Sequence, residues 1–101
     1  MPLEIQSKRG FVALSGEMNI YTAREAAERV LPLLREAKSP ALHLGQVSEF
    51  DCSALQVLLM ARREAVAAGK DLRILQASAP VREALDLLQC DELRSQIRGA
   101  A

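Results

Sequence analysis

Short apolar segments alternate with longer amphipathic segments over most of this chain, and this alternation constrains the fold more than any other feature. Residues 41–45 form a nearly all-apolar segment, typical of a strand that is buried on both faces. Residues 71–77 form another strand-like segment, and a helix-like segment follows each of the two. Because a helix that connects two strands of one sheet makes a right-handed crossover, the alternating part predicts an α/β fold with a parallel sheet.

An antiparallel hairpin is expected at the start of the chain. Residues 3–7 alternate apolar and polar side chains, as a half-buried strand does, and residues 11–15 form a second, more apolar strand. The connection between them, Lys8-Arg9-Gly10, is short enough for a tight turn. This hairpin adds an antiparallel strand to the otherwise parallel sheet.

The whole chain, residues 1–101, is expected to form a single domain, because this length can enclose one ordinary core but not two. The order of elements is strand, strand, helix, strand, helix, strand, helix, and a short edge strand is expected at residues 96–98. The sequence therefore predicts a mixed β-sheet of four to five strands with packed helices.

Three helices are predicted from apolar residues at helical spacing. The first is expected to begin at a capping box formed by Thr22 and Glu25, and to kink or break at Pro32. The second is expected to end before Gly69, which suits the left-handed position after a helix. The third lies within residues 78–89.

Charge and composition exclude several classes of function. The 13 basic and 13 acidic side chains cancel, and one Tyr, two Phe and no Trp give no stacking set, so no nucleic-acid binding is expected. The chain has no signal-peptide pattern and no apolar run near the ~20 residues that span a bilayer, so no membrane insertion is expected. The isolated Cys52 and Cys90, with a single His, indicate semi-buried free thiols, no metal site and a cytoplasmic location.

Catalytic and cofactor motifs are not found either. No G-x-G-x-x-G or G-x-x-x-x-G-K-[ST] loop is present, so no nucleotide or other cofactor is expected. His43, Asp51 and Ser53 are the residue types of a catalytic triad, but no G-x-S-x-G elbow surrounds Ser53. A lone His in an apolar strand is more often a packed residue than a catalytic base. A small serine hydrolase is therefore the least favoured reading, and the chain is not expected to be an enzyme.

The polar stretch that joins the third strand to the second helix has two interpretations. Ser53 and Gln56 form S-x-x-Q, so Ser53 is a candidate N-cap, and Asp51 competes for the same role. Such a cap stabilises a helix by about 1 kcal/mol and needs no further function. The same geometry exposes a serine hydroxyl at a helix N-terminus, where backbone NH groups would receive a phosphate.

Residues 42–93 resemble the STAS domains of bacterial anti-anti-sigma factors. The matching residues are Asp51-Cys52-Ser53-Ala54-Leu55, Gly69 and Ser78-Ala79-Pro80-Val81, and residues 14–23 are similar to the family's segment between the second strand and the first helix. Three positions depart from the family pattern: His43 stands where an Asp is common, Cys52 replaces a hydroxyl residue, and Ala54 replaces a Gly. The chain is also similar to small stand-alone STAS proteins that accompany chemotaxis genes.

The resemblance implies a non-enzymatic binding module whose partner is a serine/threonine kinase that is also an anti-sigma factor, or another bacterial signalling protein. Phosphorylation by that kinase, carried over by position, falls on Ser53, and the unphosphorylated form binds the partner. The alternative is a phosphorylation-independent scaffold in a chemotaxis or lipid-transport complex. The residues expected to contact the partner are Glu17, Asn19, Tyr21, Glu49, Asp51, Cys52, Ser53, Ala54, Gln56 and Arg63.

Overall fold

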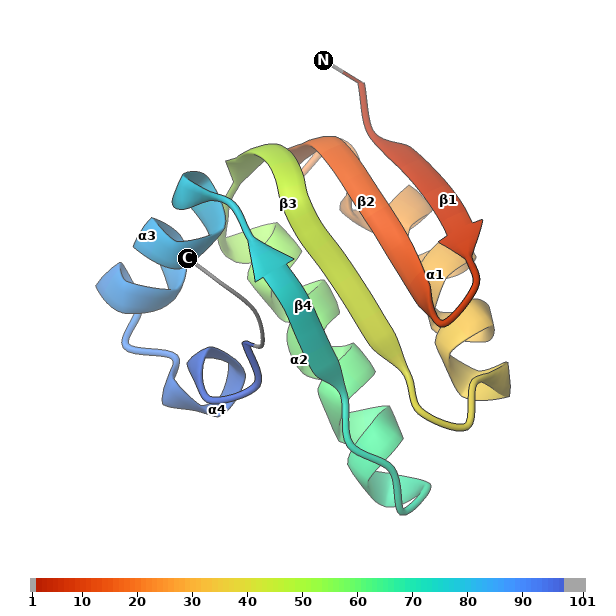
Figure 1. The fold of residues 1–101 in the computed structure, drawn as a ribbon. Coiled ribbons are helices and arrows are strands. Elements are labelled where there is room, and N and C mark those ends of the chain that lie inside the picture. The colour runs from red at the N-terminus through yellow and green to blue at the C-terminus, as the bar shows by residue number, and fades with distance from the viewer. Residues whose placement is uncertain (1, 98–101) are drawn as a thin grey trace.

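A computed structural model describes residues 2–97 of the chain. Four strands form one mixed sheet in the order β1-β2-β3-β4 (Figure 1). The hairpin strands pair antiparallel, and the other neighbouring pairs are parallel, so the predicted mixed sheet is confirmed. The strands are β1 (Glu4–Lys8), β2 (Phe11–Met18), β3 (Ala41–Phe50) and β4 (Arg73–Ala77).

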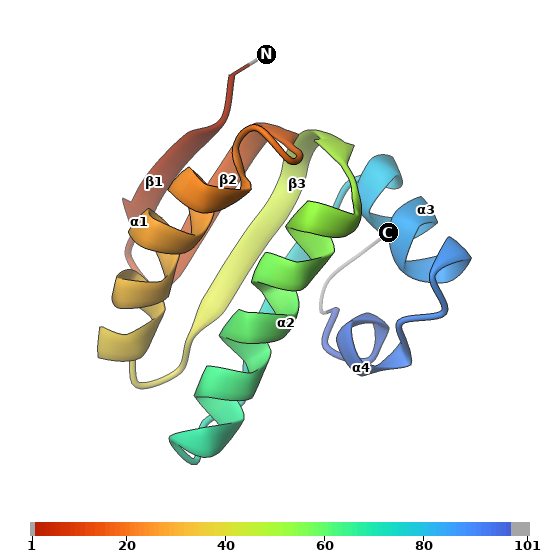
Figure 2. The same ribbon diagram turned by 180° about the vertical axis from the view of Figure 1, so that it is seen from behind.

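Two long helices cover one face of this sheet, and two short helices flank its β4 edge (Figure 2). The long helices α1 and α2 also pack against each other, while α3 contacts β3. The opposite face of strands β1 to β3 carries no helix (Figure 1). The helices are α1 (Ala23–Glu36), α2 (Cys52–Ala67), α3 (Ala79–Leu87) and α4 (Asp91–Arg94).

The core lies between the sheet and the two long helices. Strand β2 shows regular alternation, in which every second residue is buried and the residues between them are half-buried. The helices contribute apolar residues three and four positions apart, which places them on one side of each helix. The largest fully buried side chains include Leu14, Met18, Val30, Leu42, Leu44, Val47 and Leu58.

Two strands are longer than the sequence predicts. Strand β2 continues to Met18, and β3 continues from Gly45 to Phe50 along the extended β2. In the added part of β3, Val47 and Phe50 are buried and Ser48 and Glu49 between them are exposed, and the spacing of three follows an irregularity in the pairing with β2. The polar residues between them gave this segment the composition of a loop. Residues 46–50, predicted to be a loop, are therefore part of the sheet.

Helix α1 differs from the prediction at both of the positions singled out. It runs without a break through Pro32, which lies exposed on its outer side. The predicted capping box is wrong, because the Thr22 side chain makes no cap hydrogen bond. Its Oγ1 instead donates to the carbonyl oxygen of Glu17 at 2.9 Å and accepts from the Asn19 amide at 3.0 Å. Thr22 thus stabilises the turn that precedes the helix rather than the helix itself.

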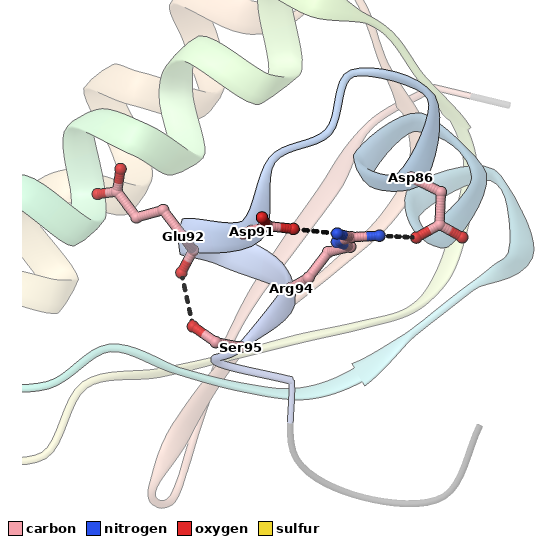
Figure 3. Close-up of polar contacts among 5 residues, drawn as sticks. All are labelled: Asp86, Asp91, Glu92, Arg94 and Ser95. Atoms are coloured by element: carbon pink, nitrogen blue, oxygen red, sulfur yellow. Dashed lines mark hydrogen bonds and ion pairs between the residues drawn. The ribbon is translucent and has the colours of Figure 1, made fainter.

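The C-terminal region is attached to the β4 edge. Ile97 forms a single parallel bridge with Ile74, so the edge strand expected at residues 96–98 is reduced to one residue, and residue 98 lies outside the described part. The Arg94 guanidinium joins α4 to α3 by donating to Asp86 Oδ1 at 2.8 Å, and it also contacts Asp91 (Figure 3). These carboxylates, Asp86 first, raise the pKa of Arg94 above its ordinary value.

Two smaller predictions have different outcomes. Gly69 adopts a φ of +76° immediately after the second helix, as expected for a residue in the left-handed region. Both cysteines are free, but only Cys90 is half-buried, whereas Cys52 is exposed at the start of α2. The prediction of two semi-buried thiols is therefore wrong for Cys52.

Replacing Leu93 with Ala is expected to lower the free energy of unfolding by about 2–5 kcal/mol, because this α4 side chain is 0 % exposed and its truncation leaves a cavity. The matched control is Leu87→Ala in α3, where the side chain is 83 % exposed and the change should stay within about 0.5 kcal/mol. Chemical denaturation followed by circular dichroism measures both. Equal effects of the two substitutions would contradict the packing of α4 described above.

Candidate functional site

The candidate site lies where strands β2 and β3 end, at the same edge of the sheet. Met18 and Phe50, the last residues of these strands, are paired, and the Asp51 amide donates to the Met18 carbonyl oxygen at 3.3 Å. The turn between β2 and α1 (residues 19–22) therefore lies beside the junction between β3 and α2 (residues 49–54). Loops at the carboxyl ends of parallel strands are where open α/β sheets present functional groups.

Asp51 holds these two segments together. Its Oδ1 accepts from the amides of Ser53 at 2.9 Å and Ala54 at 3.2 Å, which makes it the N-cap of α2. Its Oδ2 accepts from the Ile20 amide at 3.2 Å, across 31 residues of sequence. One carboxylate thus caps a helix and fixes the neighbouring turn at the same time.

This arrangement decides between the two candidate N-caps. Asp51 is the cap, and the prediction of a capping box formed by Ser53 and Gln56 is wrong. Ser53 lies inside the first turn of α2, its side chain is half-buried, and its hydroxyl has no hydrogen-bond partner among the described residues. The Ser53 and Ala54 amides, which the sequence suggested as a phosphate site, already bind the Asp51 carboxylate.

Asn19 makes a second connection between the two segments. Its Nδ2 donates to Glu49 Oε2 at 2.8 Å, and its Oδ1 accepts from the Tyr21 amide at 2.9 Å. The Asn19 side chain is buried, so it positions the turn rather than presenting itself to a partner. Because the polar groups of the turn bond inward, the intervening side chains are left to project outward.

Two large side chains do project from this turn. Ile20 is 68 % exposed and Tyr21 is 91 % exposed, and the backbone amides of both are held by the contacts just described. Exposed apolar side chains on a fixed backbone lose little conformational entropy when a partner covers them. Tyr21 was among the residues predicted from the sequence, and Ile20 lies in the same turn but was not singled out.

Helix α2 contributes an exposed stripe that starts at the same junction. Cys52, Gln56, Met60 and Arg63 follow one another at helical spacing, and all four are exposed. Of the predicted contact residues, Ala54 is different: it is only 1 % exposed and packs in the core. We refer to the exposed and half-exposed set as the junction surface. It consists of Ile20, Tyr21, Glu49, Asp51, Cys52, Ser53, Gln56, Met60 and Arg63.

Two members of the junction surface, Ile20 and Met60, were missed in the sequence. Both are large apolar residues that the sequence pattern does not assign to the core. The sequence therefore did contain an indication that they are exposed. Such a residue is informative only when its neighbours in space are known, since single exposed apolar residues are common on proteins.

The residues of the possible catalytic triad are not arranged for catalysis. His43 lies in the middle of β3 between Leu42 and Leu44, which are buried beneath the helices, so its side chain is on the other face of the sheet from Ser53. Its ring lies 5.8 Å from that of Phe11, and its Nδ1 accepts from the Gly45 amide at 3.3 Å. The geometry does not bring a base to the Ser53 hydroxyl.

Over residues 2–97, no cluster of His, Cys, Asp and Glu side chains could hold a metal ion. None of the helices in that range is long and apolar enough to cross a membrane.

A family model described as "Mlab, STAS domain" matches residues 1–95, and the chain belongs to this family. No curated protein sequence matches the chain significantly.

Solved structures of anti-sigma factor antagonists share the fold. Unphosphorylated SpoIIAA superposes with a TM-score of 0.73 at 17% identity, over 99% of this chain and 89% of that one. A Thermotoga maritima protein described as a candidate anti-sigma factor antagonist gives 0.73 at 19% identity, over 96% and 84%. Phosphorylated SpoIIAA from Bacillus gives 0.70 at 16% identity, over 99% and 92%. These likenesses establish that the chain has the STAS-like fold.

Replacing Asp51 with Ala is expected to lower the free energy of unfolding by about 1–2 kcal/mol, because the helix cap and the hydrogen bond to Ile20 are both lost. Asp51→Asn keeps one acceptor oxygen for the helix cap and replaces the other with an NH2 donor, so it should lose less than Asp51→Ala. Ser53→Ala should change stability by less than about 0.5 kcal/mol, since its hydroxyl bonds to nothing in the described chain.

Hydrogen exchange of the Ile20 amide is the direct readout of this contact. Exchange should accelerate in Asp51→Ala and remain unchanged in Ser53→Ala. A large loss of stability in Ser53→Ala with none in Asp51→Ala would reverse the assignment of the cap.

Proposed function

We propose that this protein is a non-enzymatic, single-domain regulatory module that docks a bacterial signalling protein through the junction surface, and that phosphorylation of Ser53 releases the partner. The partner class is that of anti-sigma factors with serine/threonine kinase activity, and the location is the cytoplasm. The observation that carries the proposal is the position of Ser53: it is half-exposed in the first turn of α2, next to exposed Cys52, and its hydroxyl makes no hydrogen bond within the described residues.

The composition of the junction surface supports docking of a protein. Tyr, Met and Arg are enriched in protein interfaces, and Tyr21, Met60 and Arg63 supply all three at exposed positions. Ile20 and Tyr21 stand on a turn whose backbone is already fixed, which reduces the entropy lost on binding. Glu49 and Asp51 make the centre of the surface acidic.

The Asp51 carboxylate explains how a phosphate on Ser53 would act. A phosphoserine carries about −1.5 to −2 charges near neutral pH, and the amides that could receive it are occupied by Asp51. Two unit charges 4 Å apart repel by about 1 kcal/mol in water and about 4 kcal/mol near a protein surface. This repulsion equals or exceeds the roughly 1 kcal/mol of the cap. Phosphorylation would therefore add charge and weaken the link from Asp51 to Ile20.

The second candidate is a phosphorylation-independent scaffold, in the manner expected for STAS proteins of chemotaxis or lipid-transport complexes. One observation favours it: the side-chain hydrogen bonds that hold the junction come from Asp51, Asn19 and Thr22, and none involves the Ser53 hydroxyl, so the surface forms without any change at Ser53. The two candidates share a docking surface and differ only in whether residue 53 controls it.

Substitution of Ser53 by Asp is expected to abolish capture of the native partner, because it places a permanent negative charge beside Asp51. Ser53→Ala should retain capture. The control is Ser7→Asp on β1, which adds the same charge at an exposed position in a different part of the sheet. Affinity capture from the native host, quantified by mass spectrometry, measures all three.

Phosphopeptide analysis of the protein isolated from its host completes the test. Phosphate on Ser53 in part of the population supports the switch. Partner capture that is unaffected by Ser53→Asp, together with an unmodified Ser53 under all growth conditions, would favour the scaffold. Capture that also survives Ile20→Ala and Tyr21→Ala would exclude the junction surface as the docking site.

A further inference from the structure

A cleft lies at the end of the molecule opposite the junction surface. It is formed where the β1–β2 turn, the connection after α1 and the first residues of β3 and β4 meet (Figure 1). Its volume of about 340 Å³ falls at the lower end of the roughly 300–1,000 Å³ of small-molecule pockets. The lining residues are Lys8, Gly10, Phe11, Leu34, Ala37, Lys38, Ser39, Ala41 and Arg73.

The charge of this cleft is entirely positive. Lys8, Lys38 and Arg73 come from three separate segments, and no carboxylate is among the lining residues. None of the three forms an ion pair within the described part of the chain, although five ion pairs are present elsewhere in it. The protein has no net charge, so an excess of basic residues does not explain three unpaired cations around one cleft. Their clustering is a property of the fold.

Arg73 supplies the second observation. Its Nη2 donates to the Ser39 carbonyl oxygen at 3.2 Å, but its Nε is buried and has no hydrogen-bond partner. A buried donor without an acceptor is unfavourable, and most such groups in proteins are satisfied. A guanidinium that turns toward an oxyanion in the cleft would satisfy this donor in a charge-assisted hydrogen bond.

The apolar residues of the lining indicate what the ligand contains besides an anionic group. Phe11, Leu34 and Ala37 add apolar residues to the lining, in addition to the three cations. Among the described residues, no large exposed apolar side chain belongs to this lining. A concave site of this size, with both cationic and apolar residues in its lining, suits a small molecule.

We propose that this cleft binds a small organic phosphate, with the phosphate held by Lys8, Lys38 and Arg73 and a small apolar or aromatic group placed against Phe11. A phosphate monoester is nearly dianionic at neutral pH, so it matches three cations better than a single carboxylate does. Its site is distinct from the junction surface, so the proposal does not depend on any role for Ser53.

Phenyl phosphate is a probe that combines both features. Titrated into the isotope-labelled protein, it is expected to shift the amide resonances of Lys8, Gly10, Phe11 and Lys38, with a dissociation constant on the order of 1 mM or tighter. Inorganic phosphate, which lacks the ring, and phenol, which lacks the charge, should each bind more weakly. Benzoate, with one negative charge, should fall between phenol and phenyl phosphate.

The chain offers a matched pair of variants for the test. Lys8→Gln and Arg9→Gln remove one positive charge each from adjacent exposed residues of the same turn, but only Lys8 lines the cleft. Lys8→Gln and Lys38→Gln should each weaken phenyl phosphate binding by about tenfold, as expected for the loss of one charged contact. Arg9→Gln should weaken it by less than about twofold, the residual effect of long-range charge.

Two results would contradict the proposal that the cleft binds an organic phosphate. Absence of shifts in the cleft at concentrations of several millimolar would overturn the proposal. Equal losses in Lys8→Gln and Arg9→Gln would show diffuse attraction rather than a site. Because Lys8, Arg9 and Lys38 are all exposed, the variants should keep the dispersed spectrum of the folded protein, which the same experiment records.

Discussion

The Asp51 carboxylate is the interaction on which the candidate site depends. Its Oδ1 accepts hydrogen bonds from two amides in the first turn of helix α2, and its Oδ2 accepts one from the turn that leads into α1. One side chain therefore links the start of α2 to the turn that precedes α1. Backbone amides at helix starts need acceptors, and a single residue at the end of the central strand is placed to serve two neighbouring segments.

Much of the fold could be predicted because it follows from local periodicity. The alternation of strand and helix patterns gave the parallel sheet, and Lys8-Arg9-Gly10 gave the hairpin. The second half of β3 could not be predicted in this way, because Gln46, Ser48 and Glu49 give it a polar composition. Only pairing with β2, which is distant in sequence, makes this segment a strand.

Less of the candidate site than of the fold could be predicted from local sequence patterns. The sequence indicated the segment in which helix α2 begins and both candidate caps, but the choice between Asp51 and Ser53 depends on backbone angles that residue type does not determine. The contact from Asp51 to Ile20 joins residues 31 apart, and the basic cleft collects residues from the β1–β2 turn, the α1–β3 connection and β4. Contacts of this kind follow from the tertiary fold, so no local pattern could reveal them.

The unpartnered hydroxyl of Ser53 also has a consequence for how such a protein can change over time. The residue that holds the junction together and the residue proposed to regulate it are different, and they lie two positions apart. A lineage can therefore acquire or discard control at position 53 by a single codon change while the helix start, the turn and the core remain as they are. If the proposed switch operates, regulation is separable from architecture, so the same fold can serve as a permanent adaptor in one cell and as a switch in another.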